Sequence, residues 1–437
     1  MSTVGRTAGS TTVARRSPLV IVAVAFAAIV LDGYDLMVYG AMIPELLAHP
    51  TWDLSKSEAG MIGSYTTLGM LVGALAVGAL ADILGRRRLI LLSIGSFSLA
   101  TVATAMAPTP ELFGLFRLLA GIGLGGVMPT AIALTVEYAP PGKKQLYNAA
   151  MFIGYAFGGV FAAIAALIWL ESAGFRTLLW IGAIPGLLLL PIVYKLLPES
   201  VGYLRRRGLS AQADALAEQY GLVSDDPTPG TRDAGGAIRY LLGPGRIVPL
   251  ALFSVASFSG LLLVYGLNTW LPQIMRSAGY PLGSAISFLL VLNLGAVVGT
   301  VAAGALADRL GEKIAVALCF LAATVTLLTL AYQPPTGLLY VCVAVAGLGS
   351  IGTQILVNGY AAAYFPAWTR STAVGITLGL GRVGAVVAPS MIGFVMDADL
   401  GFRWNFYSFV IPAVLGLVMI LLVPARRRVR GATPARL

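Results

Sequence analysis

The chain has 437 residues, of which 58% are hydrophobic and only 11% are charged, and its mean hydropathy is +0.86. A soluble protein of this size carries about 25% charged residues, so the composition excludes an ordinary soluble protein and indicates an all-α, multi-pass membrane protein. The net charge of +10 does not indicate a nucleic-acid partner, because the basic residues gather between apolar segments and serve to orient the chain in the lipid bilayer.

The apolar segments predict about twelve transmembrane helices, because each is close to or longer than the roughly 20 residues that span a bilayer. In chain order they cover residues 18–47, 57–81, 89–107, 110–139, 145–171, 177–198, 246–275, 283–307, 313–332, 336–365, 370–397 and 402–424. We divide the chain into a tail (1–17), a six-helix half (18–198), a linker (199–245), a second six-helix half (246–424) and a tail (425–437). Within the linker we expect a short amphipathic helix near residues 211–220 and a Pro/Gly/Asp-rich stretch at 225–236.

The loops alternate in charge along the chain. One side carries clusters of basic residues, at Arg86–Arg88, Lys143–Lys144, Arg205–Arg207 and Arg426–Arg428, whereas the other carries only scattered cations. The positive-inside rule then places both termini and the linker in the cytoplasm. We expect the protein in the cell membrane, acting as a monomer.

Several short motifs occur twice, about 226 residues apart. Gly78-Ala-Leu-Ala-Asp-Ile-Leu-Gly85 returns as Gly304-Ala-Leu-Ala-Asp-Arg-Leu-Gly311, and Gly174-Phe-Arg176 returns as Gly401-Phe-Arg403. This repeat predicts two parallel halves related by an axis along the membrane normal, with a substrate site between them near the middle of the bilayer.

Two carboxylates, Asp32 and Asp35, lie inside the first apolar segment, where each costs roughly 2.5–3.5 kcal/mol. They are three residues apart and so share one helix face. The second half has Phe258 and Leu261 in their places. Burial penalises the charged carboxylate, so we interpret at least one of them, Asp35 more than Asp32, as a group that loads and unloads a proton. The alternative is a static ion pair between helices.

Arg117 on the fourth helix is the expected partner of Asp35, because the rise of the two helices brings both to a similar depth. Glu137 lies near the other end of that helix, about 30 Å from Arg117, and we expect Arg86, Arg87 and Arg370 beside it. With Asp82 these residues form a predicted cytoplasmic gate that holds the two halves closed on the inside in one state. A static clamp on the cytoplasmic side is the alternative.

Arg382 is predicted near the middle of the eleventh helix, with no acid on its own or adjacent turns. A buried guanidinium needs a counter-anion, and a substrate carboxylate held by two hydrogen bonds would supply it. Aromatic and amide side chains on nearby helices suit a flat ring that bears a carboxylate. These candidates are Tyr34, Tyr155, Tyr265, Asn268, Trp270, Asn293, Gln354 and Asn358. For any single one of them, packing is the alternative.

The segment Gly78–Arg88, with its weaker copy at Asp308–Lys313, resembles the signature loop of the major facilitator superfamily. Asp32-Gly-Tyr-Asp35 resembles, more narrowly, the motif of the aromatic acid:proton symporters, the benzoate and hydroxybenzoate carriers. Arg117, Glu137, Arg370 and Arg382 fall where that family has charged residues. In the related sugar porters the corresponding acid and arginine form a coupling pair, and the resemblance implies this role for Asp35 and Arg117.

The resemblance implies proton-driven import of a small aromatic carboxylate, with the proton as coupling ion and no other cofactor. A carrier of another organic acid or sugar acid, and a proton antiporter that exports metabolites or drugs, are the alternatives. Such exporters usually carry a Gly-Pro motif in the fifth helix, and residues 148–167 contain no proline. The chain shows no nucleophile–base set and no metal-ligand cluster, so we expect neither an enzyme nor a metal site. Sodium in place of the proton stays open, as do the ring substituents.

Overall fold

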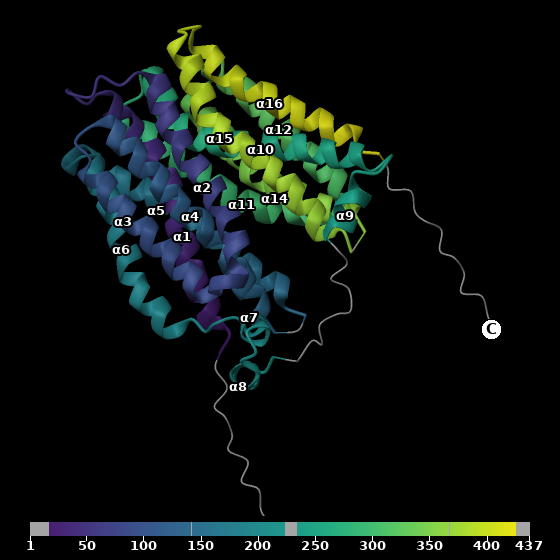
Figure 1. Ribbon diagram of the computed structural model, residues 1–437. Coiled ribbons are helices and arrows are strands. Elements are labelled where there is room, and N and C mark those ends of the chain that lie inside the picture. The colour runs from purple at the N-terminus through teal and green to yellow at the C-terminus, as the bar shows by residue number, and fades with distance from the viewer. Residues whose placement is uncertain (1–16, 141, 223–233, 367, 425–437) are drawn as a thin grey trace, which may run out of the picture.

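The computed structural model describes residues 17–140, 142–222, 234–366 and 368–424 (Figure 1). The predicted terminal tails lie outside the described residues, apart from Ser17, as does most of the stretch at 225–236. Within the described part, twelve helical spans are long and apolar enough to cross a membrane, which confirms the predicted number.

The first half contains α1 (Leu19–Leu47), α2 (Lys56–Leu84), α3 (Arg86–Met106), α4 (Pro110–Tyr138), α5 (Lys144–Ala173) and α6 (Phe175–Leu196). The described residues of the linker form three short helices, α7 (Val201–Arg206), α8 (Ser210–Tyr220) and α9 (Ala234–Leu241), of which only α8 was expected. The second half contains α10 (Ile247–Ser277), α11 (Leu282–Leu310), α12 (Glu312–Leu330), α13 (Thr336–Gly347), α14 (Thr353–Tyr364), α15 (Arg370–Asp397) and α16 (Phe402–Leu422). A π-helical turn at Leu348–Gly352 joins α13 and α14 into the tenth span.

The repeated motifs mark the same turns in both halves. Gly85 and Gly311 have φ angles of 84° and 86°, and they separate α2 from α3 and α11 from α12. Gly174 and Gly401 play the same part before α6 and α16. Only glycine adopts these positive φ values without strain. Each copy of the repeat therefore keeps a glycine where the chain reverses sharply between two spans.

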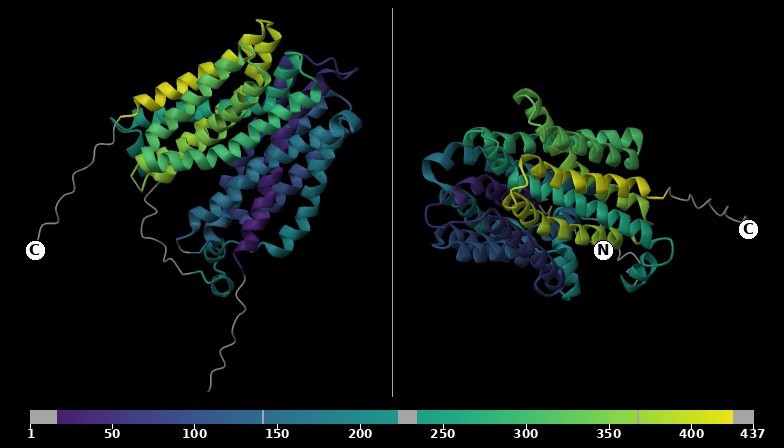
Figure 2. Two further views of the ribbon diagram at one scale, coloured as in Figure 1. Left: turned by 180° about the vertical axis from the view of Figure 1, so that it is seen from behind. Right: turned by 90° about the horizontal axis from the view of Figure 1, so that it is seen from above.

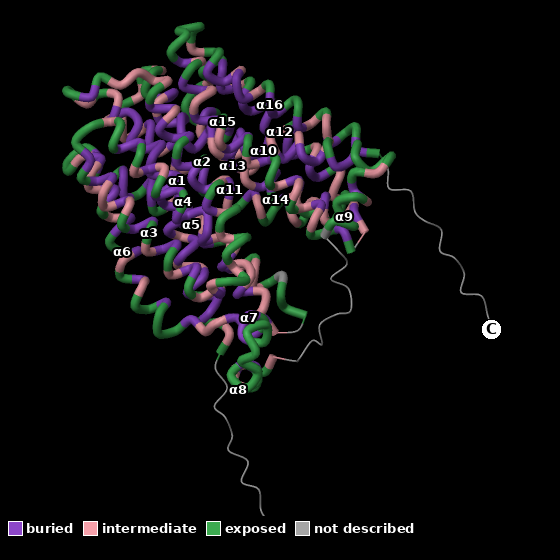
Figure 3. The backbone as a smooth tube through the Cα atoms, in the orientation of Figure 1, coloured by how far each residue is buried: buried purple, intermediate pink, exposed green. Residues whose placement is uncertain are grey.

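The two six-helix bundles lie side by side, converge at one end and diverge at the other (Figures 1 and 2). We call the end that carries α7, α8 and α9 the linker end, and the other the opposite end. The halves pack through α2 on α15, α1 on α10 and α5 on α11. The α1 and α10 spans are the most buried, at 67% of their most apolar stretch (Figure 3). The acids of α1 therefore lie in the interior, beside the other half.

Close backbone contacts seal the opposite end. A Cβ atom on Gly40 of α1 would lie 1.9 Å from the carbonyl oxygen of Asn268 on α10, and one on Gly60 of α2 would lie 2.5 Å from that of Pro389 on α15. The Asp397 carboxylate, at the end of α15, accepts hydrogen bonds from the amides of Lys56 and Ser57, at 3.1 and 2.7 Å. The halves are thus joined at the opposite end and spread at the linker end.

Candidate functional site

The predicted pair of Asp35 and Arg117 is present. The Nη1 atom of Arg117 lies 2.7 Å from both carboxylate oxygens of Asp35. Each residue is only 1% exposed, and the guanidinium also stacks on the ring of Tyr39, 5.1 Å from its centroid. Both partners belong to the first half, α1 and α4, so this ion pair does not cross between the halves.

Asp32, one turn earlier on α1, has a different environment. It is 0% exposed, and neither carboxylate oxygen has a hydrogen-bond partner within the described part of the chain. The charged groups that act on it are Arg382 of α15 and Asp35. Sequence reasoning did not anticipate that Arg382, from the other half of the molecule, acts on Asp32 electrostatically, although the two residues form no ion pair in the described structure.

Two tyrosines complete a group of four side chains between the halves. Tyr155 on α5 and Tyr265 on α10 interact electrostatically with each other, and both interact electrostatically with Asp32 and Arg382. Tyr155, Tyr265 and Arg382 are half-buried, so each side chain retains some accessible surface. We call Asp32, Tyr155, Tyr265 and Arg382 the central cluster.

Other predicted substrate contacts are occupied by helix packing. The Tyr34 hydroxyl donates to the carbonyl of Leu178 on α6, and the Trp270 indole donates to that of Pro389 on α15, each at 2.8 Å. Both side chains are buried. Their donor groups are satisfied by backbone carbonyls in this structure, an arrangement that fits the packing alternative.

The amides are only partly satisfied. Asn293 donates to the side-chain oxygen of Asn268 at 3.0 Å, and both are buried between α10 and α11, but the side-chain oxygen of Asn293 has no partner within the described residues. Gln354 donates to Ser257 at 2.9 Å and to Asn358 at 3.4 Å, while its own side-chain oxygen has no partner in the described structure. Gln354 and the half-buried Asn358 lie on α14, which directly follows the π-helical turn, a feature that is frequent at functional sites. Both residues remain candidate substrate contacts.

The predicted cytoplasmic gate is only partly assembled in this structure. Glu137 pairs with Arg86, at 2.6 Å, whereas Arg87 and Arg370 do not join this pair in the described structure. The Arg87 side chain bonds to the backbone carbonyl of Tyr194, and Arg370 is exposed at the start of α15. Because the halves diverge at the linker end, α15 does not reach this cluster.

The gate acids instead hold the linker. Glu137 accepts hydrogen bonds from the Ser200 hydroxyl and the Gly202 amide, both at 2.9 Å. Asp82 pairs with Arg206 at 2.8 Å. These contacts dock α7 onto the first half, so the acids are engaged while the linker end is open.

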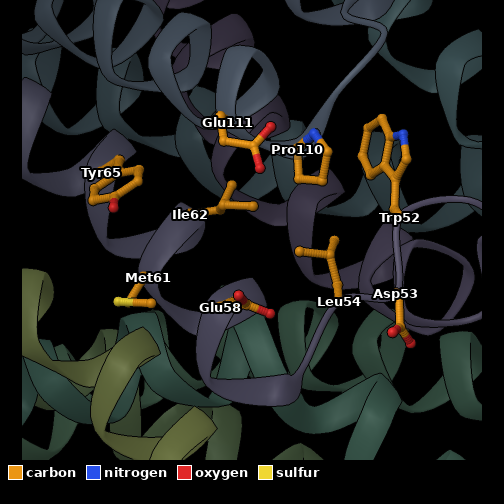
Figure 4. Close-up of a pocket in the computed structure, with 9 residues that line it drawn as sticks. All are labelled: Trp52, Asp53, Leu54, Glu58, Met61, Ile62, Tyr65, Pro110 and Glu111. Carbon is orange, nitrogen blue, oxygen red and sulfur yellow. The ribbon is translucent and has the colours of Figure 1, made fainter.

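A pocket of about 210 Å³ lies at the opposite end, between α2 and α4 (Figure 4). Trp52 and Tyr65 line it, but so do the carboxylates of Asp53, Glu58 and Glu111. Three acids around one pocket disfavour a bound carboxylate. The central cluster, with its guanidinium, is therefore the better site for an organic anion.

Two bundles that close at one end and spread at the other, with ionisable groups buried between them, define a membrane transporter of the alternating-access type. The profile of the Major Facilitator Superfamily matches residues 25–313 and 283–436. The chain belongs to the major facilitator superfamily, and it is a transporter, not an enzyme.

The chain is similar to several curated transporters over most of its length. It is 37% identical to the benzoate transport protein of Acinetobacter baylyi, over 91% of this chain and 88% of that one. It is also 37% identical to the gentisate transporter of Corynebacterium glutamicum, over 90% and 84%. Identity to the 4-hydroxybenzoate transporter PcaK of Pseudomonas aeruginosa is 31%, over 92% and 91%.

Among solved structures, the chain resembles the inward open xylose transporter XylE from E. coli, with a TM-score of 0.74 and 18% identity over 94% of this chain and 98% of that one. A partially occluded inward open structure of the same transporter gives a TM-score of 0.72 at 21% identity, over 93% and 100%. At these identities the likeness shows the fold.

Proposed function

We propose that the protein is a proton-coupled symporter that imports a small aromatic carboxylate of the benzoate or hydroxybenzoate type. The observation that carries the proposal is the central cluster, which offers a guanidinium, two tyrosines and a buried carboxylate at the interface of the two halves. The relatives named for benzoate, gentisate and 4-hydroxybenzoate support the substrate class.

We assign the linker end to the cytoplasm, because the basic clusters of the loops gather there. The protein is then a multi-pass protein of the cytoplasmic membrane with both termini inside. The spread of the halves at the linker end corresponds to a state open to the cytoplasm. The contacts of Gly40, Gly60 and Asp397 form the closed outer gate in this state.

The chemistry of binding follows from the residues of the cluster. Arg382 holds the substrate carboxylate, because a guanidinium matches the two oxygens with a pair of parallel hydrogen bonds. The rings of Tyr155 and Tyr265 provide aromatic surface for the ring of the substrate. Gln354 and Asn358 supply polar groups for ring hydroxyls. All these residues belong to one chain, so we propose that the monomer is the transporting unit.

Coupling requires an acid that can exist with and without a proton, and α1 supplies two. The bilayer interior disfavours a net buried charge, so the loaded carrier must be close to neutral when it changes state. A substrate anion accompanied by one proton satisfies this requirement. A proton gradient directed inward then drives accumulation of the acid.

The test is uptake by the purified protein in liposomes with an acidic exterior. Labelled gentisate and 4-hydroxybenzoate are the main probes, and protein-free liposomes correct for passive entry of the neutral acids. We expect accumulation that disappears when a protonophore collapses the pH gradient. Accumulation that follows a sodium gradient instead, or that requires an acidic interior, contradicts proton symport.

A further inference from the structure

The two acids of α1 are equally buried, but their partners differ, and this difference separates their roles. Asp35 receives hydrogen bonds on both oxygens from Arg117, whereas both oxygens of Asp32 lack a partner within the described residues. The following inference rests on the proposed function. We propose that Asp32, and not Asp35, carries the transported proton, and that its carboxylate and the substrate carboxylate alternate as the counter-anion of Arg382.

The pair of Asp35 and Arg117 is poorly suited to carry a proton. Both helices belong to the first half, so rocking of one half against the other leaves the pair intact. Protonating Asp35 would strand a guanidinium that is 1% exposed, and loss of one partner from a buried ion pair costs about 3–5 kcal/mol. The pair therefore serves to hold α1 to α4 throughout the cycle.

Asp32 and Arg382 have the opposite arrangement. They belong to different halves, α1 and α15, so their separation changes when the halves move. Arg382 acts on Asp32 electrostatically, yet within the described structure it forms neither an ion pair nor a hydrogen bond with it. A carboxylate that enters between the halves can therefore bind Arg382 without first breaking a direct bond.

The charges around Asp32 decide what a bound anion does. The ionisable groups that face it are Asp35 on its own helix, Tyr155 of α5, Tyr265 of α10 and Arg382 of α15. Arg117 already neutralises Asp35, so among the described residues Arg382 is the cation that remains for Asp32. When a substrate carboxylate arrives, two anions share that cation, and like charges in a buried site favour protonation of one.

The resulting cycle balances charge and atoms. In the outward-facing state, a proton from the outer water binds an Asp32 oxygen, and the substrate carboxylate takes its place beside Arg382. In the inward-facing state, the substrate leaves, Asp32 returns the proton to the cytoplasmic water, and its carboxylate again faces Arg382. One proton and one monovalent anion cross together, without net charge.

The test measures proton uptake when gentisate binds to the purified full-length protein in weakly buffered detergent solution. Wild type is compared with Asp32→Asn and with the neutral pair Asp35→Asn/Arg117→Gln, which leaves no buried charge unpaired. We expect about one proton per bound gentisate in wild type and in the neutral pair. Asp32→Asn binds gentisate without proton uptake.

The pH dependence of affinity gives a second readout. Above the pH at which Asp32 titrates, linkage predicts that the affinity of wild type falls by up to about tenfold per pH unit, whereas that of Asp32→Asn stays constant. Proton uptake by Asp32→Asn equal to that of wild type overturns the inference. Loss of proton uptake only in the neutral pair overturns it in favour of Asp35.

A third measurement separates this inference from the proposed function. If gentisate, benzoate and 4-hydroxybenzoate all fail to bind wild type, the proposed function is wrong, and infrared titration of the protein without substrate decides the proton site. A protonated carboxyl band that is missing in Asp32→Asn supports Asp32 as the site. A band that persists there and is missing in the neutral pair overturns it.

Discussion

The substitution Gly40→Ala, which adds a single methyl group, tests whether the protein alternates between two states. Gly40 lies on α1 where this helix touches α10 of the other half, at the closed end of the molecule. A Cβ atom there would be 1.9 Å from the backbone oxygen of Asn268 and 2.9 Å from that of Thr269. Ordinary contact begins at 3.4 Å, so Gly40→Ala forces the two helices apart by about 1.5 Å.

The clash acts only while the opposite end is closed. Overpacking of this kind costs about 1–3 kcal/mol, and a bias of that size shifts an equilibrium between two states about 5- to 150-fold. Gly40→Ala should therefore move the protein from the state described here towards the state that is open at the opposite end.

Distances between spin labels follow this shift. One pair, Thr51→Cys with Asp399→Cys, spans the halves at the opposite end, and another, Lys143→Cys with Arg309→Cys, spans them at the linker end. All four positions are exposed, and the buried Cys319 and Cys342 are first replaced by alanine. Gly40→Ala should lengthen the first distance and shorten the second.

Two controls identify the cause. Gly121→Ala places a Cβ atom 2.1 Å from the backbone oxygen of Thr66, but α4 and α2 belong to the same half, so it should lower stability without changing the distance distributions. Gly304→Ala meets nothing within 4 Å and should change neither. Unchanged distances in Gly40→Ala would refute the reasoning, because the contact would then persist in both states.

Three further perturbations test other parts of the structure. Asp397→Ala removes the carboxylate that accepts hydrogen bonds from the first two amides of α2, a loss of about 0.5–2 kcal/mol. The variant should shift the same label distances in the same direction as Gly40→Ala. Unchanged distances would show that this contact does not stabilise the closed opposite end. Asp35→Asn should lower stability by about 3–5 kcal/mol because Arg117 is left unpaired, and adding Arg117→Gln should recover most of it in thermal unfolding followed by tryptophan fluorescence; a double variant no more stable than the single one argues against this cause. Glu137→Gln weakens the docking of α7 by at most about 1 kcal/mol, since the ion pair of Glu137 is partly exposed. It should speed tryptic cleavage at Arg205–Arg207 and leave gentisate affinity unchanged. Cleavage at the same rate in the variant and in wild type would contradict the docking role.

The fold could be predicted in detail because each span leaves a long apolar segment and each turn of the repeat leaves a glycine. The break in the tenth span could not, because the π-helical turn at Leu348–Gly352 contains no proline and no charged residue that would mark an interruption in the sequence. The short helices α7 and α9 were missed because a helix of only six or eight residues is too short to establish a helical pattern of apolar residues in the sequence.

The site was predictable only within one half. Helical rise placed Asp35 within reach of the long Arg117 side chain, and the two residues are paired. The proximity of Asp32 to Arg382 depends on how the two halves meet, which no local pattern specifies. The expected contact of Arg370 with Glu137 is not made in this structure for a related reason, since it depends on which end of the molecule is open, and it stays a prediction for the state that is closed at the linker end.

The most direct measurement of the central claim compares two kinds of transport by Asp32→Asn in liposomes. One is accumulation of labelled gentisate under an imposed pH gradient, and the other is exchange of labelled for unlabelled gentisate at equal pH on both sides. We predict that wild type performs both, and that Asp32→Asn exchanges gentisate but does not accumulate it. Accumulation by Asp32→Asn to the level of wild type would contradict the account.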